Sequence, residues 1–266
     1  MNTHTIGQVF LIEDDGTLIL PPSQTGLNFY SISLVKSYAT FRQTWGDHYD
    51  FIALYVDVPS LRIPQGPAYP ETFHWWVYND VAGIHHRKGD SFDTRADFQN
   101  SRRLLGIQQF PKDGFSRTNN PPDWGDLASQ YTRLHEIGHQ WGSFVWFDVG
   151  AGPSPDLLDT VKAWHWGPKF DCDQSAMNDA GLPADWVPDP TNPNSFKDEW
   201  LVPEQADYCP LDLYLMGMLP SGDPRLDNLY FIGGPTPIAH TNDGDVHTGV
   251  RVNLTLGNIT AVEGER

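Results

Sequence analysis

A His-Glu-x-x-His motif is the feature that most constrains this 266-residue chain. It runs from His135 to His139, inside the stretch LASQYTRLHEIGHQWGSF, residues 127–144. On a helix, residues i and i+4 lie on the same face, so the two imidazoles can bind one metal ion. Glu136 can then reach a water molecule on that ion. The motif therefore predicts a zinc-dependent hydrolase.

The residues around the motif favour a helix. Asp126 is expected to cap its N-terminus, and Gly142 to end it. Gly138 costs about 1 kcal/mol of helix propensity relative to alanine, so we expect another segment to approach the helix closely there. Apolar and small residues recur at helical spacing and predict a buried stripe beside the two histidines: Leu127, Tyr131, Leu134, Gly138 and Trp141.

The motif has only three fixed positions, and the same residues also occur on solvated helix faces. Here the flanking residues Leu134, Ile137 and Trp141 are bulky and apolar. A buried, ionised Glu136 would be costly without a metal or another partner. The flanks therefore favour a metal site over a solvated face.

Charge and composition exclude several classes of protein. The formal net charge is −17, with 17 basic and 34 acidic residues, which opposes binding to nucleic acid or to anionic membranes. The chain contains no run of about 18 apolar residues, so no membrane span is expected. Scattered carboxylates can bind calcium at the surface, but there is no EF-hand loop.

The N-terminal residues lack the basic and apolar regions of a signal peptide. We expect a secreted, monomeric protein whose signal peptide is missing from this sequence. Cys172 and Cys209 lie in loop-rich sequence, where a disulfide closing a 37-residue span would stabilise the fold. Two reduced thiols are the alternative, and two cysteines are too few for a thiolate zinc site.

The order of predicted elements indicates an α+β fold whose N-terminal half is α/β-like. We expect one catalytic domain, residues 1–266, in which a mixed twisted sheet within residues 1–145 backs the motif helix. Residues 146–266 would form a loop-rich C-terminal subdomain, with functional loops over residues 167–207. The predicted elements are a hairpin at Val9–Leu20, a helix at Tyr30–Trp45, a strand buried on both faces at Asp50–Val58, strands at Phe73–Val81 and Leu104–Phe110, an apolar segment at Leu211–Met218, and a strand and turn at Asn253–Gly264.

A catalytic zinc ion needs a third protein ligand, which leaves a fourth position for water. An extended H-E-x-x-H-x-x-G-x-x-H pattern would place that ligand at residue 145, which is Val145. The next histidine is His165, between Trp164 and Trp166. The rival ligands are Asp171, Asp173, Glu199 and Asp212, with His85 and His86 as a weaker pair.

The segment HEIGHQWG resembles the active-site helix of zincin metallopeptidases. Gly142 and Ser175-Ala176-Met177 are similar to features of the metzincins, which place a methionine turn beneath the zinc. The fuller pattern is similar to a group of secreted bacterial proteins of largely uncharacterised function, over roughly residues 50–266. In that group H-E-x-G-H-x-W is followed by an H-W pair, D-x-S-x-M and S-P-L-D-L-Y-L-M-G. The matching residues are His165-Trp166, Asp173–Met177 and Cys209–Gly217, with Cys209 in place of the serine.

The resemblance implies that His165 completes the metal site and that Met177 or Met216 lies below the metal. The terminal ITAVEGER also fits the group and suggests that the natural protein continues beyond Arg266. Val145 departs from the metzincin pattern, so membership of the metzincins proper is not implied.

The predicted function is that of a zinc metalloendopeptidase acting on protein or peptide substrates. Glu136 would transfer the proton of the attacking water, and Tyr208 or Tyr214 would support the oxyanion. One of three carboxylates would orient the imidazoles: Asp159, Asp173 or Asp212. Two other functions fit the sequence: a zincin-fold module that binds glycans or peptides, suggested by ten Trp and ten Tyr, and a zinc amidase that acts on cell-wall peptides.

Overall fold

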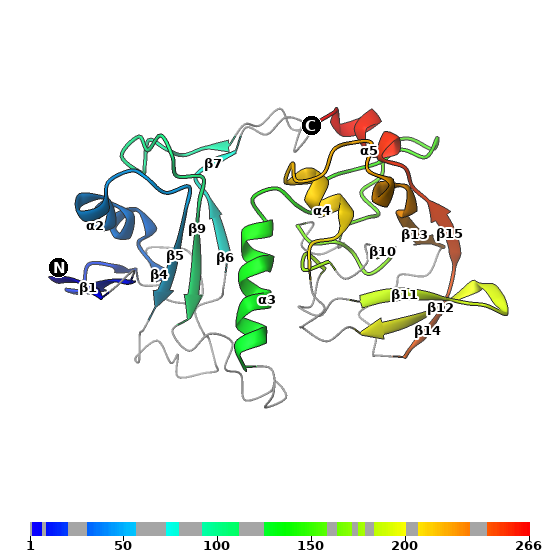
Figure 1. Cartoon of the computed structure of the whole chain (residues 1–266), viewed down its shortest axis with the longest axis horizontal. Coiled ribbons are helices and arrows are strands. Elements are labelled where there is room, and N and C mark those ends of the chain that lie inside the picture. The colour runs from blue at the N-terminus through cyan, green and yellow to red at the C-terminus, as the bar shows by residue number, and fades with distance from the viewer. Residues whose placement is uncertain are drawn as a thin grey trace. The chain divides into compact units, whose positions relative to one another are not determined.

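A computed structural model describes eleven stretches of the chain: residues 2–6, 9–20, 31–56, 73–79, 92–111, 125–158, 164–171, 175–178, 184–200, 207–234 and 244–266. The chain divides into two compact units, residues 1–79 with 92–116 and residues 80–91 with 117–266 (Figure 1). Both contain helices and small sheets, which confirms the predicted α+β class. The predicted single catalytic domain, with its subdomain boundary after residue 145, stays a prediction.

The first unit has a mixed three-stranded sheet. Its central strand β9 runs parallel to β5 and antiparallel to β6. That this sheet packs behind the motif helix stays a prediction. The elements are β1 (Asn2–Ile6), β2 (Val9–Glu13), β3 (Ile19–Leu20), β4 (Ser31–Ile32), α2 (Leu34–Trp45), β5 (Phe51–Val56), β6 (Phe73–Trp76), β7 (Tyr78–Asn79), β8 (Phe92–Asp93) and β9 (Gly106–Pro111).

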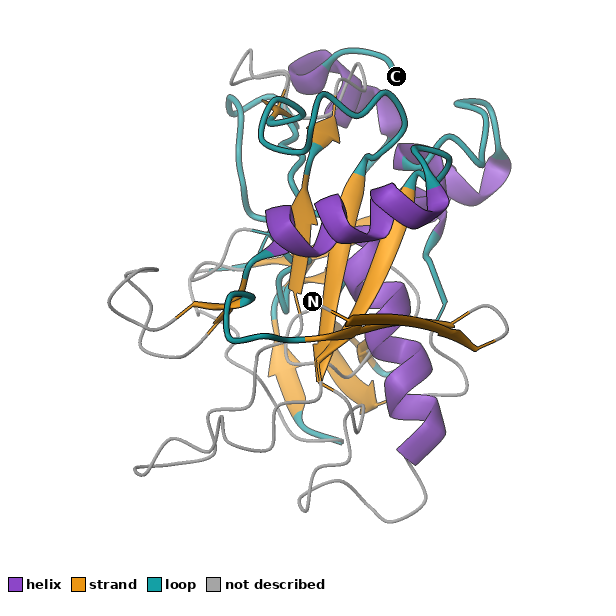
Figure 2. Ribbon diagram, turned by 90° about the vertical axis from the view of Figure 1, so that its left-hand side faces the viewer, coloured by secondary structure: helices purple, strands orange, loops and turns teal. Residues whose placement is uncertain are grey.

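Helix α2 lies across the strands of this sheet (Figure 2). Its buried side includes Tyr38, which belongs to the same apolar cluster as Ile52 of β5 and Ile107 of β9. The helix begins at Leu34 rather than at the predicted Tyr30, because Ser33 caps it by accepting a hydrogen bond from the Lys36 N–H. It ends at Trp45 as predicted.

The predicted hairpin at Val9–Leu20 is wrong. Strand β2 pairs with β1, and β3 pairs with β4. Between β2 and β3, the Asp14 carboxylate accepts hydrogen bonds from the N–H groups of Gly16 and Leu18. These bonds hold the Asp-Asp-Gly segment in a local loop that does not bring β2 and β3 together.

The strand predictions for the sheet hold in position but not in detail. Strand β5 buries Ile52 and Val56 and leaves Tyr55 49% exposed, so the predicted burial of both faces is wrong. The strand predicted at Phe73–Val81 is broken between β6 and β7. There the carbonyl of Leu105 accepts hydrogen bonds from both Val77 N–H and Tyr78 N–H, as at a β-bulge.

The second unit contains the motif helix α3 and two antiparallel sheets, ordered β10-β13-β15 and β11-β12-β14. A large apolar cluster holds it together and includes Phe147, Trp166, Met177 and Leu211. The elements are α3 (Gly125–Gly138), β10 (Phe170–Asp171), β11 (Ala184–Asp189), β12 (Asn192–Trp200), α4 (Pro210–Leu215), the 3-10 helix η5 (Pro224–Asn228), β13 (Tyr230–Gly233), β14 (Val246–Thr248), β15 (Val250–Asn253) and α5 (Leu256–Glu263).

Two predictions for this unit are wrong. Residues 167–207 are not free of regular structure, because β11 and β12 pair over most of their length, with a register shift at Pro188/Asp189. In the predicted strand and turn at Asn253–Gly264, Asn253 is the last residue of β15, and most of the rest is helix α5, which begins at Leu256 because Thr255 and Asn258 make a reciprocal capping box. Among the described helices, none is both long enough and apolar enough to cross a membrane, as predicted.

Candidate metal centre

Helix α3 and the turn that follows it present the motif. The helix begins at Gly125, so Asp126 is its second residue rather than its cap. It ends at Gly138, four residues before the predicted end, and the N–H of Gly142 closes the next turn onto the Gly138 carbonyl at 2.8 Å. His139 lies in that turn. Of the predicted stripe, Tyr131 is buried, whereas Leu134 and Trp141 are half-buried.

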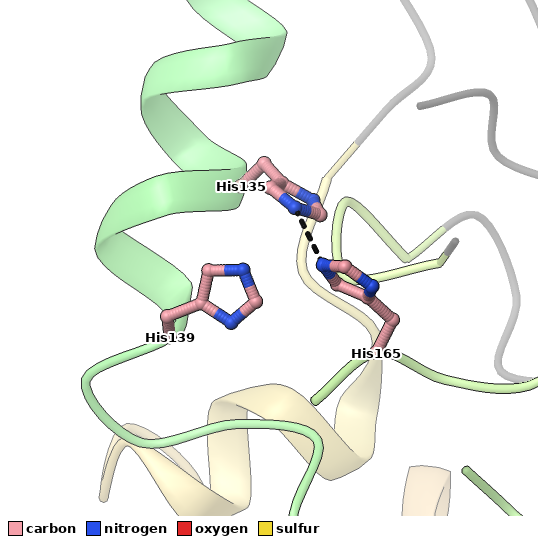
Figure 3. Close-up of side chains that lie close together, drawn as sticks. All are labelled: His135, His139 and His165. Atoms are coloured by element: carbon pink, nitrogen blue, oxygen red, sulfur yellow. Dashed lines mark hydrogen bonds between the residues drawn. The ribbon is translucent and has the colours of Figure 1, made fainter. Parts of the chain in front are cut away.

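Three imidazole rings face one another at this point: His135, His139 and His165 (Figure 3). Their ring centroids are separated by 4.8 Å for His135–His139, 4.8 Å for His135–His165 and 4.9 Å for His139–His165. One potential ligand atom from each ring lies within 4.8 Å of the others. His165 is thus the histidine that the fold adds to the motif pair.

The hydrogen bonds of His135 fix which of its nitrogens faces the other rings. Its Nδ1 atom lies 2.7 Å from the carbonyl oxygen of Ala176. A carbonyl only accepts, so Nδ1 carries the proton and the neutral ring keeps a lone pair on Nε2. That Nε2 atom lies 3.1 Å from Nε2 of His165. A metal-binding histidine typically has its other nitrogen tied in this way.

The spacing of the rings fits a metal ion. Two nitrogens bound to one tetrahedral zinc at about 2.0–2.1 Å lie about 3.3 Å apart, close to the 3.1 Å between His135 and His165. A direct hydrogen bond between those two rings is the simpler explanation of that one distance. It does not explain why His139 completes a nearly equilateral triangle with them. One metal ion held between them would explain the positions of all three rings.

Glu136 follows His135 on α3 and is 5% exposed. Carboxylates are rarely so deeply buried without a partner or a function. Its place in the chain, directly after His135, is the one that the motif predicts for a group that handles protons.

Close approach to the motif helix, predicted from Gly138, is confirmed. A Cβ atom at Gly138 would lie 2.2 Å from Sδ of Met177 and 3.1 Å from Cε1 of Tyr208. Met177 is fully buried and packs in the space that the missing side chain leaves. Met216, the alternative to Met177 below the metal, is the C-cap residue of α4 and is also buried.

The two candidate tyrosines make different contacts. The Tyr208 hydroxyl donates a hydrogen bond to the carbonyl of Leu134, directly before His135. Burial, and then the charges of Asp212 and Asp207, raise the pKa of Tyr208, so it stays a neutral donor. The Tyr214 hydroxyl accepts a hydrogen bond from the N–H of Arg266 at 3.2 Å.

Asp212 is fully buried on α4. Burial raises its pKa to about 6, against the opposing effect of three hydrogen bonds. The donors are Trp166 Nε1 at 2.8 Å, Ser175 Oγ at 2.6 Å and the Cys209 N–H at 2.9 Å. The sequence predicts Asp212 either as the third ligand or as a group that orients the imidazoles. Its carboxylate accepts hydrogen bonds from Trp166, which follows His165, and from Ser175, which precedes Ala176. The carbonyl of Ala176 is the group that holds His135.

The other candidates lie elsewhere or outside the described residues. Glu199 pairs with Lys197 Nζ at 3.0 Å, and Asp171 accepts a long hydrogen bond from the Trp186 N–H. Cys209 is buried, but its predicted partner Cys172 is not described, so the disulfide stays a prediction. The undescribed candidates are His85, His86, Asp159, Cys172 and Asp173.

Two contributors to the site have weak signals in the sequence. The backbone carbonyl of Ala176 holds His135. Every residue has such a carbonyl, so the residue type at position 176 does not predict this contact. Trp166 donates from its indole to Asp212; its place beside His165 was the only signal available. Comparison of the chain with protein-family models, with curated proteins and with solved structures gives no match, so the case for this centre rests on its own geometry.

Proposed function

We propose that this protein is a zinc-dependent metallopeptidase in which His135, His139 and His165 hold one zinc ion. The observation that carries the proposal is the convergence of three imidazoles, two of them four residues apart, with the buried Glu136 directly after His135 in the chain. A donor set of three nitrogens favours zinc over magnesium or calcium, which prefer oxygen ligands. Three protein ligands also leave a position open for water or substrate.

In the proposed hydrolysis, Glu136 and Ala176 have different roles. When bound, zinc lowers the pKa of water to about 7 and polarises the scissile carbonyl. Glu136 takes a proton from the attacking water and delivers it to the leaving amine. Ala176 fixes the orientation of His135 through its carbonyl. Burial of Glu136 keeps bulk water away from the proton that it carries.

The resemblance and the charge support the proposed substrate and location. The resemblance of HEIGHQWG to the zincin metallopeptidases supports proteins or peptides as substrates, and the similarity to a group of secreted bacterial proteins supports an extracellular location. The net charge of −17 opposes polyanionic partners such as nucleic acid. We propose a monomer, since one chain supplies all three imidazoles.

The test compares Glu136→Gln with wild type for zinc content and for cleavage of casein and a fluorogenic peptide library. The variant should keep its zinc and lose at least about 100-fold in rate, the usual contribution of a general base. Glu199→Gln is the matched control, because that carboxylate pairs with Lys197 on β12; it should retain full activity. Chelation of the metal should abolish cleavage, and added zinc should restore it.

Other outcomes contradict the proposal in distinct ways. Equal cleavage by Glu136→Gln and wild type would remove the glutamate from the mechanism. Tight zinc binding without cleavage of any peptide, together with retention of a glycan or peptide, would indicate a binding module. Cleavage confined to cell-wall peptides would indicate an amidase.

A further inference from the structure

We infer that Asp212 is a positioning residue for the metal centre, because one buried carboxylate ties together the two segments that place His165 and His135. The inference builds on the proposed metal site and adds how its ligands are aligned. Asp212 lies on α4, a different element from either histidine.

One oxygen of Asp212 holds the segment that carries His165. The Trp166 indole donates from Nε1 to Asp212 Oδ1 at 2.8 Å. Trp166 is fully buried and follows His165 directly. Its backbone N–H donates to the Met177 carbonyl at 2.9 Å. The tryptophan is therefore held at both its backbone and its ring, which leaves His165 little freedom to turn away.

The other oxygen holds the segment that orients His135. Ser175 donates from Oγ to Asp212 Oδ2 at 2.6 Å and accepts a hydrogen bond from the Met177 N–H at 2.9 Å. Ala176 lies between these two residues, and its carbonyl holds His135 Nδ1. The serine thus fixes the short turn whose carbonyl sets the orientation of the His135 ring.

Asp212 connects separate segments of the chain, because its hydrogen-bond donors come from different parts of the sequence. Its third donor is the N–H of Cys209, at the start of α4. The carboxylate is completely buried, so no solvent can take the place of a lost donor. A displacement of either segment changes the hydrogen bonds of the same carboxylate, which couples the placement of the two imidazoles.

The test removes one donor at a time and measures zinc affinity by competition with a chromophoric chelator. Trp166→Phe deletes the indole N–H and keeps an aromatic ring. Trp186→Phe is the matched control: Trp186 is also buried in the second unit, but its Nε1 donates to the Pro168 carbonyl at 2.9 Å. Trp166→Phe should weaken zinc binding by about 10- to 100-fold, and Trp186→Phe should leave it unchanged. Equal zinc affinity in the two variants overturns the inference.

Ser175→Ala gives a second, metal-free measurement. In apo protein, ¹H–¹⁵N spectra report exchange of the His135 Nδ1 proton that is bonded to Ala176. Ser175→Ala should accelerate that exchange, and Trp186→Phe should not. An unchanged exchange rate in Ser175→Ala overturns the inference. This measurement decides the question even if the Trp166→Phe variant does not fold.

The two proposals fail separately. If wild type binds zinc without cleaving peptides, the peptidase proposal fails while the affinity comparison still decides the role of Asp212. If wild type binds no zinc, the metal site fails, and the proton-exchange comparison decides whether Asp212 orients His135.

Discussion

The Nε2 atoms of His135 and His165 lie 3.1 Å apart although 30 residues separate the two histidines in the chain. His135 lies inside α3, and His165 lies after it, next to the buried Trp166. The fold thereby adds a third imidazole to the two of the motif, and three is the number of protein ligands that the proposed catalytic zinc would need.

Replacement of His165 tests that third ring. His165→Asn should lower zinc affinity by more than about 100-fold. Loss of a hydrogen-bond partner of a metal ligand costs about 10- to 100-fold, and loss of the ligand itself should cost more. His247→Asn is the matched control: His247 is also half-buried in the second unit, but packs edge-on against Trp186. Zinc titration checks both variants, and wild-type affinity in His165→Asn would remove this residue from the site.

Gly138→Ala should destabilise the protein by up to about 2 kcal/mol. Alanine gains about 1 kcal/mol of helix propensity, but its Cβ would lie 2.2 Å from the sulfur of the fully buried Met177. Overpacking of this kind costs about 1–3 kcal/mol.

The control for this clash is the same change made in a Met177→Ala background. With the sulfur gone, Gly138→Ala should become neutral or stabilising in urea unfolding. If its effect has the same size in both backgrounds, the contact with Met177 is not the cause.

Asp212 should make the metal-free protein less stable as pH rises. Burial raises the pKa of its carboxyl from 3.8 to about 6 in the folded protein. The stability that the protonated carboxyl contributes is therefore fully present below pH 3.8 and is lost as pH rises to about 6 and above. The total loss in the free energy of unfolding is about 3 kcal/mol.

Urea unfolding of wild type and Asp212→Asn between pH 4 and 7.5 measures this loss. The amide does not titrate, so the difference between the two free energies of unfolding should change with pH across that range. Two parallel curves would show that Asp212 titrates at the same pH in the folded and unfolded chains.

Ser143→Gly should stabilise the protein by about 1 kcal/mol. Ser143 has a φ of 61°, where a side chain costs about 1–2 kcal/mol. Its buried hydroxyl has no hydrogen-bond partner among the described residues, which adds a further cost. Glycine removes both costs and returns about 0.5–1 kcal/mol in backbone entropy.

Ser143→Ala separates the two contributions, because it removes the hydroxyl and keeps the strained backbone. Thermal unfolding should place it between wild type and Ser143→Gly. A Ser143→Gly variant less stable than wild type would show that the hydroxyl has a partner in solution.

Local features of the sequence were sufficient for several parts of the site. The i, i+4 spacing of His135 and His139 places both rings on one side, since a helix repeats every 3.6 residues. The small residue Gly138 predicted close approach by another segment, which turned out to be Met177. The predicted end of α2 at Trp45 is the observed one, and Gly46 follows it with a φ of 74°.

Contacts between distant segments decided the rest. The sequence left His165 among several possible ligands, and only the fold brings it to His135. Strand β2 pairs with β1 rather than β3, and β11 with β12 in a region predicted to be irregular. Helical periodicity depends on near neighbours and can be read from the chain. Strand pairing and convergence of side chains depend on which distant surfaces bury one another, and that is settled only when the chain is folded.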